Sequence, residues 1–285
     1  MVIEMRKIEN MTFDEERELY NIKDTLVYNC RFEGINDGES QIKESSGVIV
    51  DKSYFDLRYP IWHNDNFKIM NSEFSINSRA PIWYSNNGNI LNTKIYSVKA
   101  IRECNNIKFN NCDINSTEFA WKSNEIDIVN SKLVSEYAFF ESKDIFIEDI
   151  EFSGKYSFQY VSNMEIINSK IDTKDAFWHS KNVVVKDSII NGEYLGWYSE
   201  NLTLINCKIK GTQPLCYCKN LRLVDCIMEN ADLAFEYSSV EATIKGHIDS
   251  IKNPISGKIE CDSLGENINS NSKYKTSCVI IINRW

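Results

Sequence analysis

The chain has 285 residues, of which 42% are hydrophobic and 26% are charged, a composition typical of a folded soluble protein. Its formal net charge of −9 argues against binding of nucleic acid through the phosphates. No apolar run approaches the ~18–20 residues that cross a bilayer, and the N-terminal residues include acids and no small-residue cleavage site. We therefore expect a cytoplasmic protein that binds neither nucleic acid nor membrane.

A period of 19 residues organises the chain. Tyr160, His179, Tyr198 and Tyr217 stand at successive steps of this period. Self-similarity at a fixed period of this size indicates a stacked-repeat architecture. We take this column as position 0 of each repeat, and it holds in turn His63, Tyr84, Glu103, Lys122, Glu141, Tyr160, His179, Tyr198, Tyr217 and Glu236.

Three apolar columns recur in each repeat, at positions +4, +6 and +11 relative to position 0. Met164, Ile166 and Ile171 are the members in the repeat of Tyr160. The residue between positions +4 and +6 is mostly polar, and this alternation predicts a short strand with one buried face.

Position +8 is Asn or Asp in nearly every repeat, as at Asn111, Asn168 and Asn206. Asn tolerates left-handed backbone and forms local hydrogen bonds, which suits a sharp corner between strands. Stacked at the ~4.8 Å spacing of strands, these side chains are expected to bond from repeat to repeat as a ladder. This structural role accounts for the column, so we assign it no metal or catalytic function.

These columns predict an all-β fold, a single-stranded right-handed parallel β-helix (solenoid) of about 11 coils with capped ends. We expect one domain over residues 1–285, with an N-terminal cap or first coil at 1–20, coils over 21–252 and a C-terminal cap at 253–285. The step from His63 to Tyr84 is longer than the period, so a small insertion is expected near residues 75–79.

The nine cysteines, with no export signal, are expected to be reduced thiols. Cys216 and Cys218 lack the two-residue spacing of zinc and redox pairs. Cys112, Cys207 and Cys226 share one position of the repeat that elsewhere holds Ser or Thr. We interpret them as small buried residues and expect no metal and no cofactor.

Several runs carry a resemblance to a known family, among them Leu57-Arg-Tyr-Pro-Ile-Trp-His63 and Gly192-Glu-Tyr-Leu-Gly-Trp-Tyr-Ser199, with further runs at 37–40, 157–160, 173–179 and 211–217. They resemble an uncharacterised bacterial family known only as a domain of unknown function. That family belongs among the pectate-lyase-like right-handed β-helices. The resemblance covers nearly the whole chain and implies the fold, but it supplies no established catalytic residue.

The remaining strand of each coil, over positions −5 to 0, is expected to carry the chemistry. Alternate residues of a strand face opposite ways, so the Trp-rich position −1 and the Tyr/Glu/His position 0 cannot both point outward. Because charges are rarely buried unpaired, we place positions 0 and −4 outward and most of the tryptophans inward. Arg102 and Gln159 at position −1 do not fit this arrangement well.

Aromatic rings interleaved with carboxylates suit sugars, whose apolar faces stack on the rings. The substrate-binding candidates on this face are Tyr84, Tyr156, Tyr160, Tyr194, Tyr198 and Tyr217. A glycosidase needs two carboxyl groups about 5–9.5 Å apart, and Glu103 and Glu141, two coils apart, are expected to meet this requirement. Lys122 between them makes a stabilising charge ladder the alternative.

Further catalytic candidates are His179, which lies between two tyrosines, Asp175 at position −4, and His63. A second patch near the N-terminal coils contains Arg58, Arg79, Lys99 and Arg102. These cations could hold a uronate or a phosphate, with His63 or Tyr84 taking a proton. A solvated face that balances nearby acids is the alternative.

The sequence thus favours a carbohydrate-binding or carbohydrate-processing β-helix with a saccharide ligand, and it leaves open whether the protein is an enzyme, such as a lyase or glycoside hydrolase. One alternative is a non-enzymatic scaffold that docks a protein partner on the exposed sheet. Another is an acidic rod that mimics nucleic acid. We rank the rod last, because tyrosines and lysines interrupt its acids.

Overall fold

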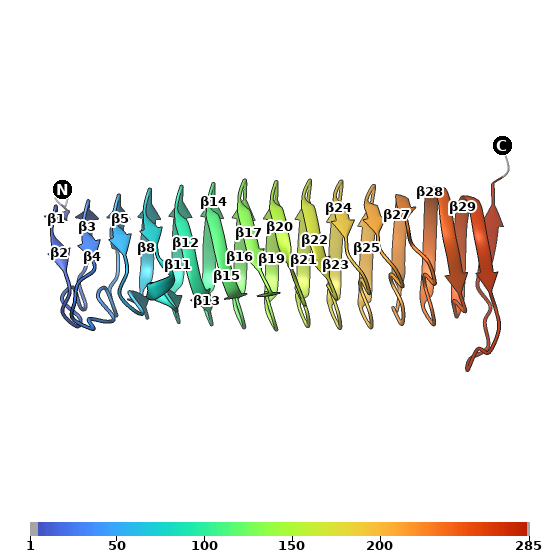
Figure 1. Cartoon of the computed structure of the whole chain (residues 1–285), viewed down its shortest axis with the longest axis horizontal. Coiled ribbons are helices and arrows are strands. Elements are labelled where there is room, and N and C mark those ends of the chain that lie inside the picture. The colour runs from blue at the N-terminus through green and yellow to red at the C-terminus, as the bar shows by residue number, and fades with distance from the viewer. Residues whose placement is uncertain (1–4, 284–285) are drawn as a thin grey trace. The chain divides into compact units, whose positions relative to one another are not determined.

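The computed structural model of the chain describes residues 5–283, which form two compact units, one within 1–135 and one within 136–285. Both units are wound from parallel strands (Figure 1). The only helical element among the described residues is a 3₁₀ turn, η1 (Ile76–Ser78). The all-β parallel solenoid is therefore confirmed, but it has about 15 turns of about 19 residues, so the expected count of about 11 was too low. The early turns were undercounted because their lengths depart from the period, and the terminal segments also wind as turns.

In unit 1 the strands pair in three parallel files, and successive strands of a file come from successive turns. The first file is β1 (Arg6–Glu9), β3 (Thr25–Tyr28), β5 (Ile49–Asp51), β8 (Asp65–Met70), β11 (Asn86–Leu91), β14 (Asn105–Asn110) and β16 (Asn124–Val129). The second file is β2 (Thr12–Phe13), β4 (Arg31–Phe32), β6 (Tyr54–Phe55), β9 (Glu73–Phe74), β12 (Lys94–Lys99), β15 (Asp113–Phe119) and β17 (Lys132–Ser135). The third file is short, with β7 (Ile61–Trp62), β10 (Ile82–Trp83) and β13 (Ile101–Arg102).

Unit 2 begins with β18 (Tyr137–Ala138) and continues the parallel winding to its last strand. Its first file is β19 (Lys143–Glu148), β21 (Ser162–Ile167), β23 (Lys181–Lys186), β25 (Glu200–Ile205), β27 (Leu221–Glu229), β28 (Ser239–Lys252), β29 (Ser256–Ile268) and β30 (Val279–Ile282). Its second file is β20 (Glu151–Lys155), β22 (Lys170–Lys174), β24 (Ile189–Asn191) and β26 (Lys208–Lys210), and β27 is long enough to continue both files.

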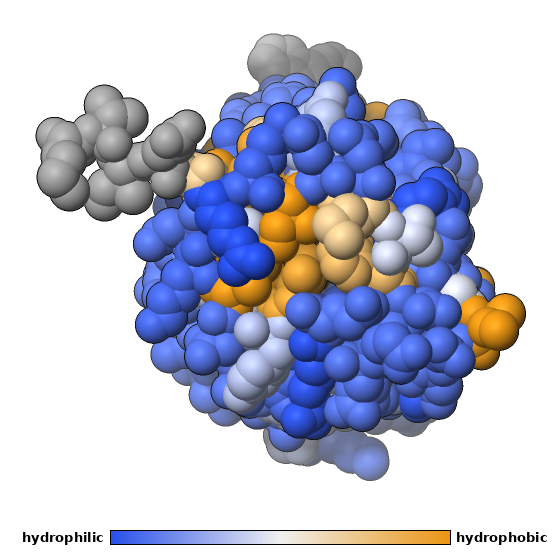
Figure 2. Space-filling model, turned by 90° about the vertical axis from the view of Figure 1, so that its left-hand side faces the viewer, coloured by the Kyte–Doolittle hydropathy of each residue, from blue (hydrophilic) through white to orange (hydrophobic). Residues whose placement is uncertain are grey.

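The predicted apolar columns are confirmed as the core. Met164 pairs with Val183, which pairs with Leu202, so position +4 stacks turn on turn with side chains at most 3% exposed. Phe55 at position +11 stacks on Phe32 at 4.5 Å between ring centroids. Figure 2, which views the molecule from the N-terminal side of Figure 1, shows apolar side chains at the centre and hydrophilic ones around them.

Gly88 occupies position +4 in the turn after Phe67. A Cβ atom on Gly88 would lie 2.3 Å from Cζ of Phe67, so only glycine leaves room for that ring. The insertion expected near residues 75–79 is confirmed as η1, after which Asp65 pairs with Asn86 instead of a residue 19 positions on.

The corner column is also confirmed. Asn111, Asn168 and Asn206 have φ between 47° and 54°, in the left-handed region that Asn tolerates. Asn111 Nδ2 donates to Asn92 Oδ1 at 2.9 Å, and Asn206 Nδ2 donates to Asp187 Oδ1 at 2.7 Å. These hydrogen bonds between turns give partners to the polar side chains at the exposed corner.

Within the described residues, the strand expected over positions −5 to 0 is present as the two-residue strands β7, β10 and β13 of unit 1 and as β18 at the start of unit 2. In unit 2 the equivalent segments after β18 are turns, with left-handed residues at positions −4, −2 and 0, such as Asp175, Phe177 and His179. The prediction of a continuous sheet on this side was therefore wrong for unit 2. Phe158 and Phe177 at position −2 fill its core here, with ring centroids 4.9 Å apart.

Candidate functional site

The side chains of position 0 leave the corner outward, because every residue from His63 to Tyr217 in this column has φ between 50° and 60°. Tyr160 and Tyr198 are 50% and 47% exposed, and His63 and His179 are also exposed. The outward placement of position 0 is confirmed, although a left-handed corner and not a straight strand produces it.

In unit 2 these side chains form one continuous file of rings, which we call the ring ladder: Tyr160, His179, Tyr198, Tyr217 and Tyr237. Centroids are 4.9 Å apart from Tyr160 to His179, 5.0 Å from His179 to Tyr198 and 4.8 Å from Tyr198 to Tyr217. The interplanar angles of these pairs are 6–12°, so the rings lie face to face. Each inner ring therefore has both faces covered by its neighbours and offers a ligand only its edge.

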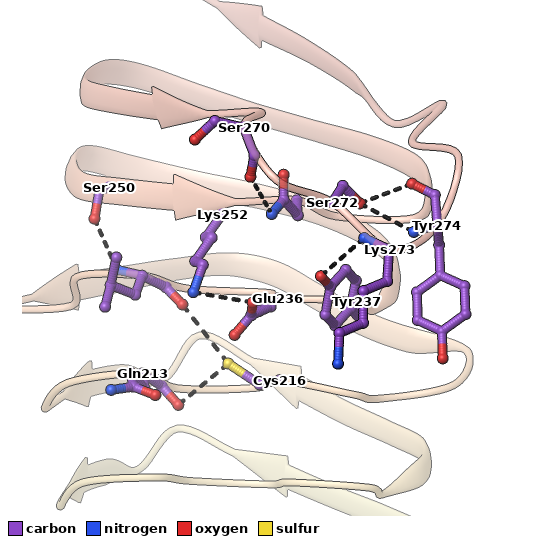
Figure 3. Close-up of polar contacts among 12 residues, drawn as sticks. Gln213, Cys216, Glu236, Tyr237, Ser250, Lys252, Ser270, Ser272, Lys273 and Tyr274 are labelled. Atoms are coloured by element: carbon purple, nitrogen blue, oxygen red, sulfur yellow. Dashed lines mark hydrogen bonds and ion pairs between the residues drawn. The ribbon is translucent and has the colours of Figure 1, made fainter.

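The last step of the ring ladder differs from the sequence prediction. The residue that follows Tyr217 in the column is Tyr237, with φ of 53° and a ring centroid 5.9 Å away, and not Glu236. One extra residue in this turn shifts the register. Glu236 instead forms an ion pair with Lys252 at 3.0 Å (Figure 3).

A loop from the end of unit 2 covers the final rung. Tyr274 meets Tyr237 edge to face at 5.1 Å, and the backbone N–H of Lys273 donates to the Tyr237 hydroxyl at 3.2 Å (Figure 3). At the previous rung, burial raises the pKa of Tyr217 to about 12, and the nearby Glu236 carboxylate adds to this shift. The Tyr217 hydroxyl is thus a firm hydrogen-bond donor at neutral pH.

Unit 1 carries a shorter version of the column. His63 and Tyr84 stack at 4.9 Å with an angle of 12°. The next member is Glu103, which ends the run of rings, and Lys122 follows it. Glu141, the second carboxyl of the predicted catalytic pair, lies in unit 2 after β18. The pairing of Glu103 and Glu141 stays a prediction.

Position −1 is half-buried, between core and surface, and most of its members have one shared contact. Each reaches the backbone carbonyl at position −4 of the next turn. Trp62 Nε1 donates to Ala80 O at 2.7 Å and Trp197 Nε1 to Gln213 O at 2.9 Å. Gln159 Nε2 donates to Asp175 O at 3.2 Å, so this residue, which did not fit the predicted inward column, replaces Trp as a donor.

Arg102 occupies position −1 in a different way. Its guanidinium lies between the rings of Trp83 and Trp121, 5.1 Å from each centroid, and continues the stack in which Trp62 and Trp83 are 5.3 Å apart. The cation is held by aromatic faces, which attract it through their quadrupoles.

Position −4 of unit 2 carries Tyr156, Asp175 and Tyr194, each with φ near 55°. Asp175 is only 6% exposed, and burial raises the pKa of its carboxyl above the usual value, although Lys174 and Lys155 counteract part of this. The ammonium of Lys174 lies 5.6 Å from the Tyr194 ring centroid and 3.5 Å from Glu193 Oε2. Asp175 is thus enclosed beside lysines and does not stand on the open face with the tyrosines.

The N-terminal cations are not one free patch. Arg58 pairs with Asp37 at 2.5 Å and with Glu39 at 3.3 Å, and Lys99 pairs with Glu118 at 3.5 Å. Arg58 and Arg79 line a surface hollow of about 350 Å³ together with Asp37, Asp56 and Asn77. Asn77 Nδ2 donates to both carboxylate oxygens of Asp56, so this acid of the wall already has hydrogen-bond partners within the chain.

Sequence reasoning missed a second amide ladder at position +3. Asn163, Asn182, Asn201 and Asn220 each donate to the residue one turn earlier, at 2.8–3.2 Å. The signal was present in the sequence, because Asn recurs at position +3 at the same 19-residue step.

Hollows of about 380 and 390 Å³ in unit 2 are lined by the two amide columns and their neighbours, and not by rings of the ring ladder.

All nine cysteines are free, and eight of them are buried. Cys207 Sγ lies 3.4 Å from the carbonyl oxygen of Val185 one turn below, where neighbouring turns place Ser hydroxyls. Burial raises the pKa of the Cys104 thiol to about 12.

Within residues 5–283, no three His, Cys, Asp or Glu side chains gather closely enough to hold a metal ion, and no helix is long and apolar enough to cross a membrane.

A model of the family described as "Protein of unknown function (DUF3737)" matches residues 6–282, so the chain belongs to this family. A comparison with curated proteins finds no match.

Solved structures with a similar winding include three proteins of 8–9% identity. A tailspike mutant of E. coli bacteriophage HK620 in complex with a hexasaccharide has a TM-score of 0.46 over 92% of this chain and 60% of the tailspike chain. PfbA, a surface adhesin of Streptococcus pneumoniae, has a TM-score of 0.42 over 89% of this chain and 85% of its own. The catalytic domain of GH87 alpha-1,3-glucanase in complex with nigerose has a TM-score of 0.38 over 96% and 63%. Likeness of this degree carries no inference about ligand or activity.

Proposed function

We propose that this member of a family of unknown function is a non-catalytic saccharide-binding protein, and that the ring ladder of unit 2 binds an extended saccharide chain along its edge. The observation that carries the proposal is the file of rings spaced 4.8–5.0 Å apart from Tyr160 to Tyr217, in which Tyr160, His179 and Tyr198 are exposed. A linear polymer with one sugar unit per turn can repeat the same contact at each rung.

The chemistry of the edges favours an oxygen-rich ligand. An aromatic ring is negative on its faces and positive at its edge, so exposed edges attract oxygen lone pairs. The phenol hydroxyls of Tyr160 and Tyr198 and the imidazole of His179 add hydrogen-bonding groups to this row. Sugars do not stack on the inner rings in this arrangement, because their faces are already covered.

Two carboxyl groups beside the ring ladder, Asp175 and Glu193, are poorly placed for hydrolysis, and Glu141, at position 0 one turn before Tyr160, supplies a single exposed carboxyl. A glycosidase needs two carboxyl groups across the scissile bond. Near the ring ladder, Asp175 is 6% exposed and Glu193 is paired with Lys174 at 3.5 Å. Asp175 is therefore not exposed along the ring ladder, and Glu193 is already paired with a lysine.

The test is binding of neutral and acidic oligosaccharides to the full chain, measured by titration calorimetry with Tyr198→Phe and Tyr198→Ala. Edge-on recognition through the hydroxyl predicts that Tyr198→Phe loses most of the affinity, nearly as much as Tyr198→Ala. Tyr96→Phe is the matched control, because Tyr96 donates to Asp113 in unit 1 at 2.7 Å, outside the ladder.

Two results would contradict the proposal. Full affinity in Tyr198→Phe would mean that the ligand does not use the ladder edge. Failure of all saccharides at millimolar concentration, while a protein partner docks on the ladder, would replace the saccharide with a protein ligand and make the unit an interaction scaffold.

We also propose that the protein works in a reducing compartment such as the cytoplasm. The supporting observation is that nine cysteines are unpaired in a chain whose buried thiols replace Ser hydroxyls. Thiol titration of the denatured protein, purified without reductant, should find most of the nine free. Four stable disulfides would overturn this assignment.

A further inference from the structure

Arg102 is the exception in a column whose other donors share one contact. Trp62, Trp83, Gln159, Trp178, Trp197 and Cys216 all donate to the carbonyl at position −4 of the next turn. For Arg102 that carbonyl belongs to Glu118, and it already accepts hydrogen bonds from Ser116 Oγ at 2.8 Å and from Ala100 N at 3.2 Å. The guanidinium therefore does not take part in the contact that explains the rest of the column.

The orientation of this guanidinium is fixed by the rings around it. The register pairs Trp83 with Arg102 and Arg102 with Trp121, and both ring centroids lie 5.1 Å from Cζ of Arg102. Since the indoles cover both faces of the planar group, only its edge, with five N–H donors, remains for hydrogen bonding.

These donors have no acceptor in the part of the chain that the structure describes. Nε is enclosed and makes no hydrogen bond with residues 5–283, and the contacts of the guanidinium there are the rings of Trp83 and Trp121. A buried donor without a partner costs about 1–3 kcal/mol, and more when it is charged. An arginine kept in this state, where other turns have a neutral donor, indicates an acceptor from outside the chain.

A second cation, Lys99, lies in the same turn as Arg102, together with the acid Glu103. Lys99 is three residues earlier, and its backbone carbonyl accepts the indole N–H of Trp83, which ties it to the same stack. Lys99 itself is paired with Glu118 at 3.5 Å with its side chain 39% exposed, so its ammonium can turn to a competing oxyanion. A guanidinium edge matches the two oxygens of a carboxylate or phosphate in a bidentate pair.

We propose that Arg102 is an oxyanion-binding residue of unit 1, which takes a carboxylate or phosphate group on its guanidinium edge, with Lys99 as a second cation in the same turn. The site lies within unit 1 and does not depend on the function proposed for the ring ladder. A charged sugar or a metabolite could supply either group.

The test follows the indole N–H resonance of Trp83 in the full chain by NMR during titration with inorganic phosphate, acetate or chloride. Phosphate and acetate should shift the resonance saturably, and chloride at equal ionic strength should not. A sugar phosphate and a uronate then distinguish which source supplies the group. Arg222→Gln, which removes an exposed arginine of β27, should leave the titration unchanged.

Arg102→Trp is the decisive variant, because it continues the Trp62–Trp83 stack and should keep the fold while removing the cation. We expect at least a tenfold loss of phosphate affinity, with an unchanged melting temperature as the control. Arg102→Lys keeps the charge without the fork and should weaken binding by several-fold. Equal affinity in Arg102→Trp, or equal shifts with chloride, would overturn the proposal.

Discussion

The two units share one repeat but differ in the segment that leads to position 0. In unit 1 it forms the strands β7, β10 and β13, where position −2 holds Ile61, Ile82 and Ile101. At Ala120, the last such position of unit 1, the backbone is already left-handed, with φ of 54°. In unit 2 it is a left-handed turn, and position −2 holds residues such as Phe158, Phe177 and Leu215, with φ of 60–62°. Branching at Cβ makes a left-handed backbone strongly unfavourable, so isoleucine selects the strand.

The exposed columns do not follow this difference in backbone. Position −1 stacks indoles in both units, Trp62 on Trp83 and Trp178 on Trp197, each pair at 5.3 Å. In the turns of unit 2, position 0 extends into a ladder of five rings. The core columns are alike in both units, so the frame is constant while the exposed columns vary.

The largest effect is expected from removing a ring at position −2 of unit 2. Phe177 is fully buried and stacks on Phe158 at 4.9 Å. Phe177→Ala should lower the free energy of unfolding by about 3–5 kcal/mol, because it leaves a cavity in the core. Urea denaturation measures this loss. A loss below about 1 kcal/mol would mean that the turn does not depend on its ring.

A second substitution at the same position isolates the backbone. Phe177→Leu copies Leu215, which has φ of 62°, whereas Phe177→Ile places a β-branched residue there. Both variants remove similar volume, so the isoleucine variant should be less stable by an additional ~1–2 kcal/mol from left-handed strain. Ile82→Leu in unit 1 should show no such backbone penalty. Equal stability of the two Phe177 variants would contradict the role of branching.

The frame could be predicted from the sequence because its positions constrain residue type. Burial requires Ile, Leu, Val or Phe at positions +4, +6 and +11, and the corner requires a residue such as Asn206 that accepts φ near 51°. Both demands recur at every turn, so they appear as columns.

The site could not be predicted to the same extent. Alternation suggested a strand before position 0, but Phe177 and Leu215 carry no local signal for left-handed backbone. The shift from Glu236 to Tyr237 needs only one extra residue, which a fixed spacing does not detect. Exposed positions are not constrained by packing. Position 0 therefore accepts Tyr, His, Glu or Lys, and these residue types do not predict one local structure.

A pH-dependent effect should distinguish the enclosed end of the ring ladder from its exposed rungs. Burial raises the pKa of Tyr217 from 10.0 to about 12, so its phenol stays protonated in the folded state when it has ionised in the unfolded state. The stability that this phenol contributes is complete below pH 10 and is lost as pH rises toward 12. Between about pH 9 and about pH 11, urea melts should show a smaller loss of stability for Tyr217→Phe than for the wild type. Tyr274→Phe, at a 58% exposed tyrosine, should behave as the wild type.

The smallest effect is expected from the charge pairs that flank the rings. Lys174 and Glu193 in unit 2 are 45% and 50% exposed, and the corresponding values for Lys99 and Glu118 in unit 1 are 39% and 21%. Exposed pairs contribute about 0.2–1 kcal/mol and are screened by salt. Lys174→Met, which keeps the packing of the side-chain stem, should therefore cost about 0.5 kcal/mol or less in low salt and almost nothing in high salt. Lys99→Met should cost somewhat more, because Glu118 is less exposed. A loss of saccharide binding in Lys174→Met without loss of stability would extend the binding surface of unit 2 from the ring ladder to position −5.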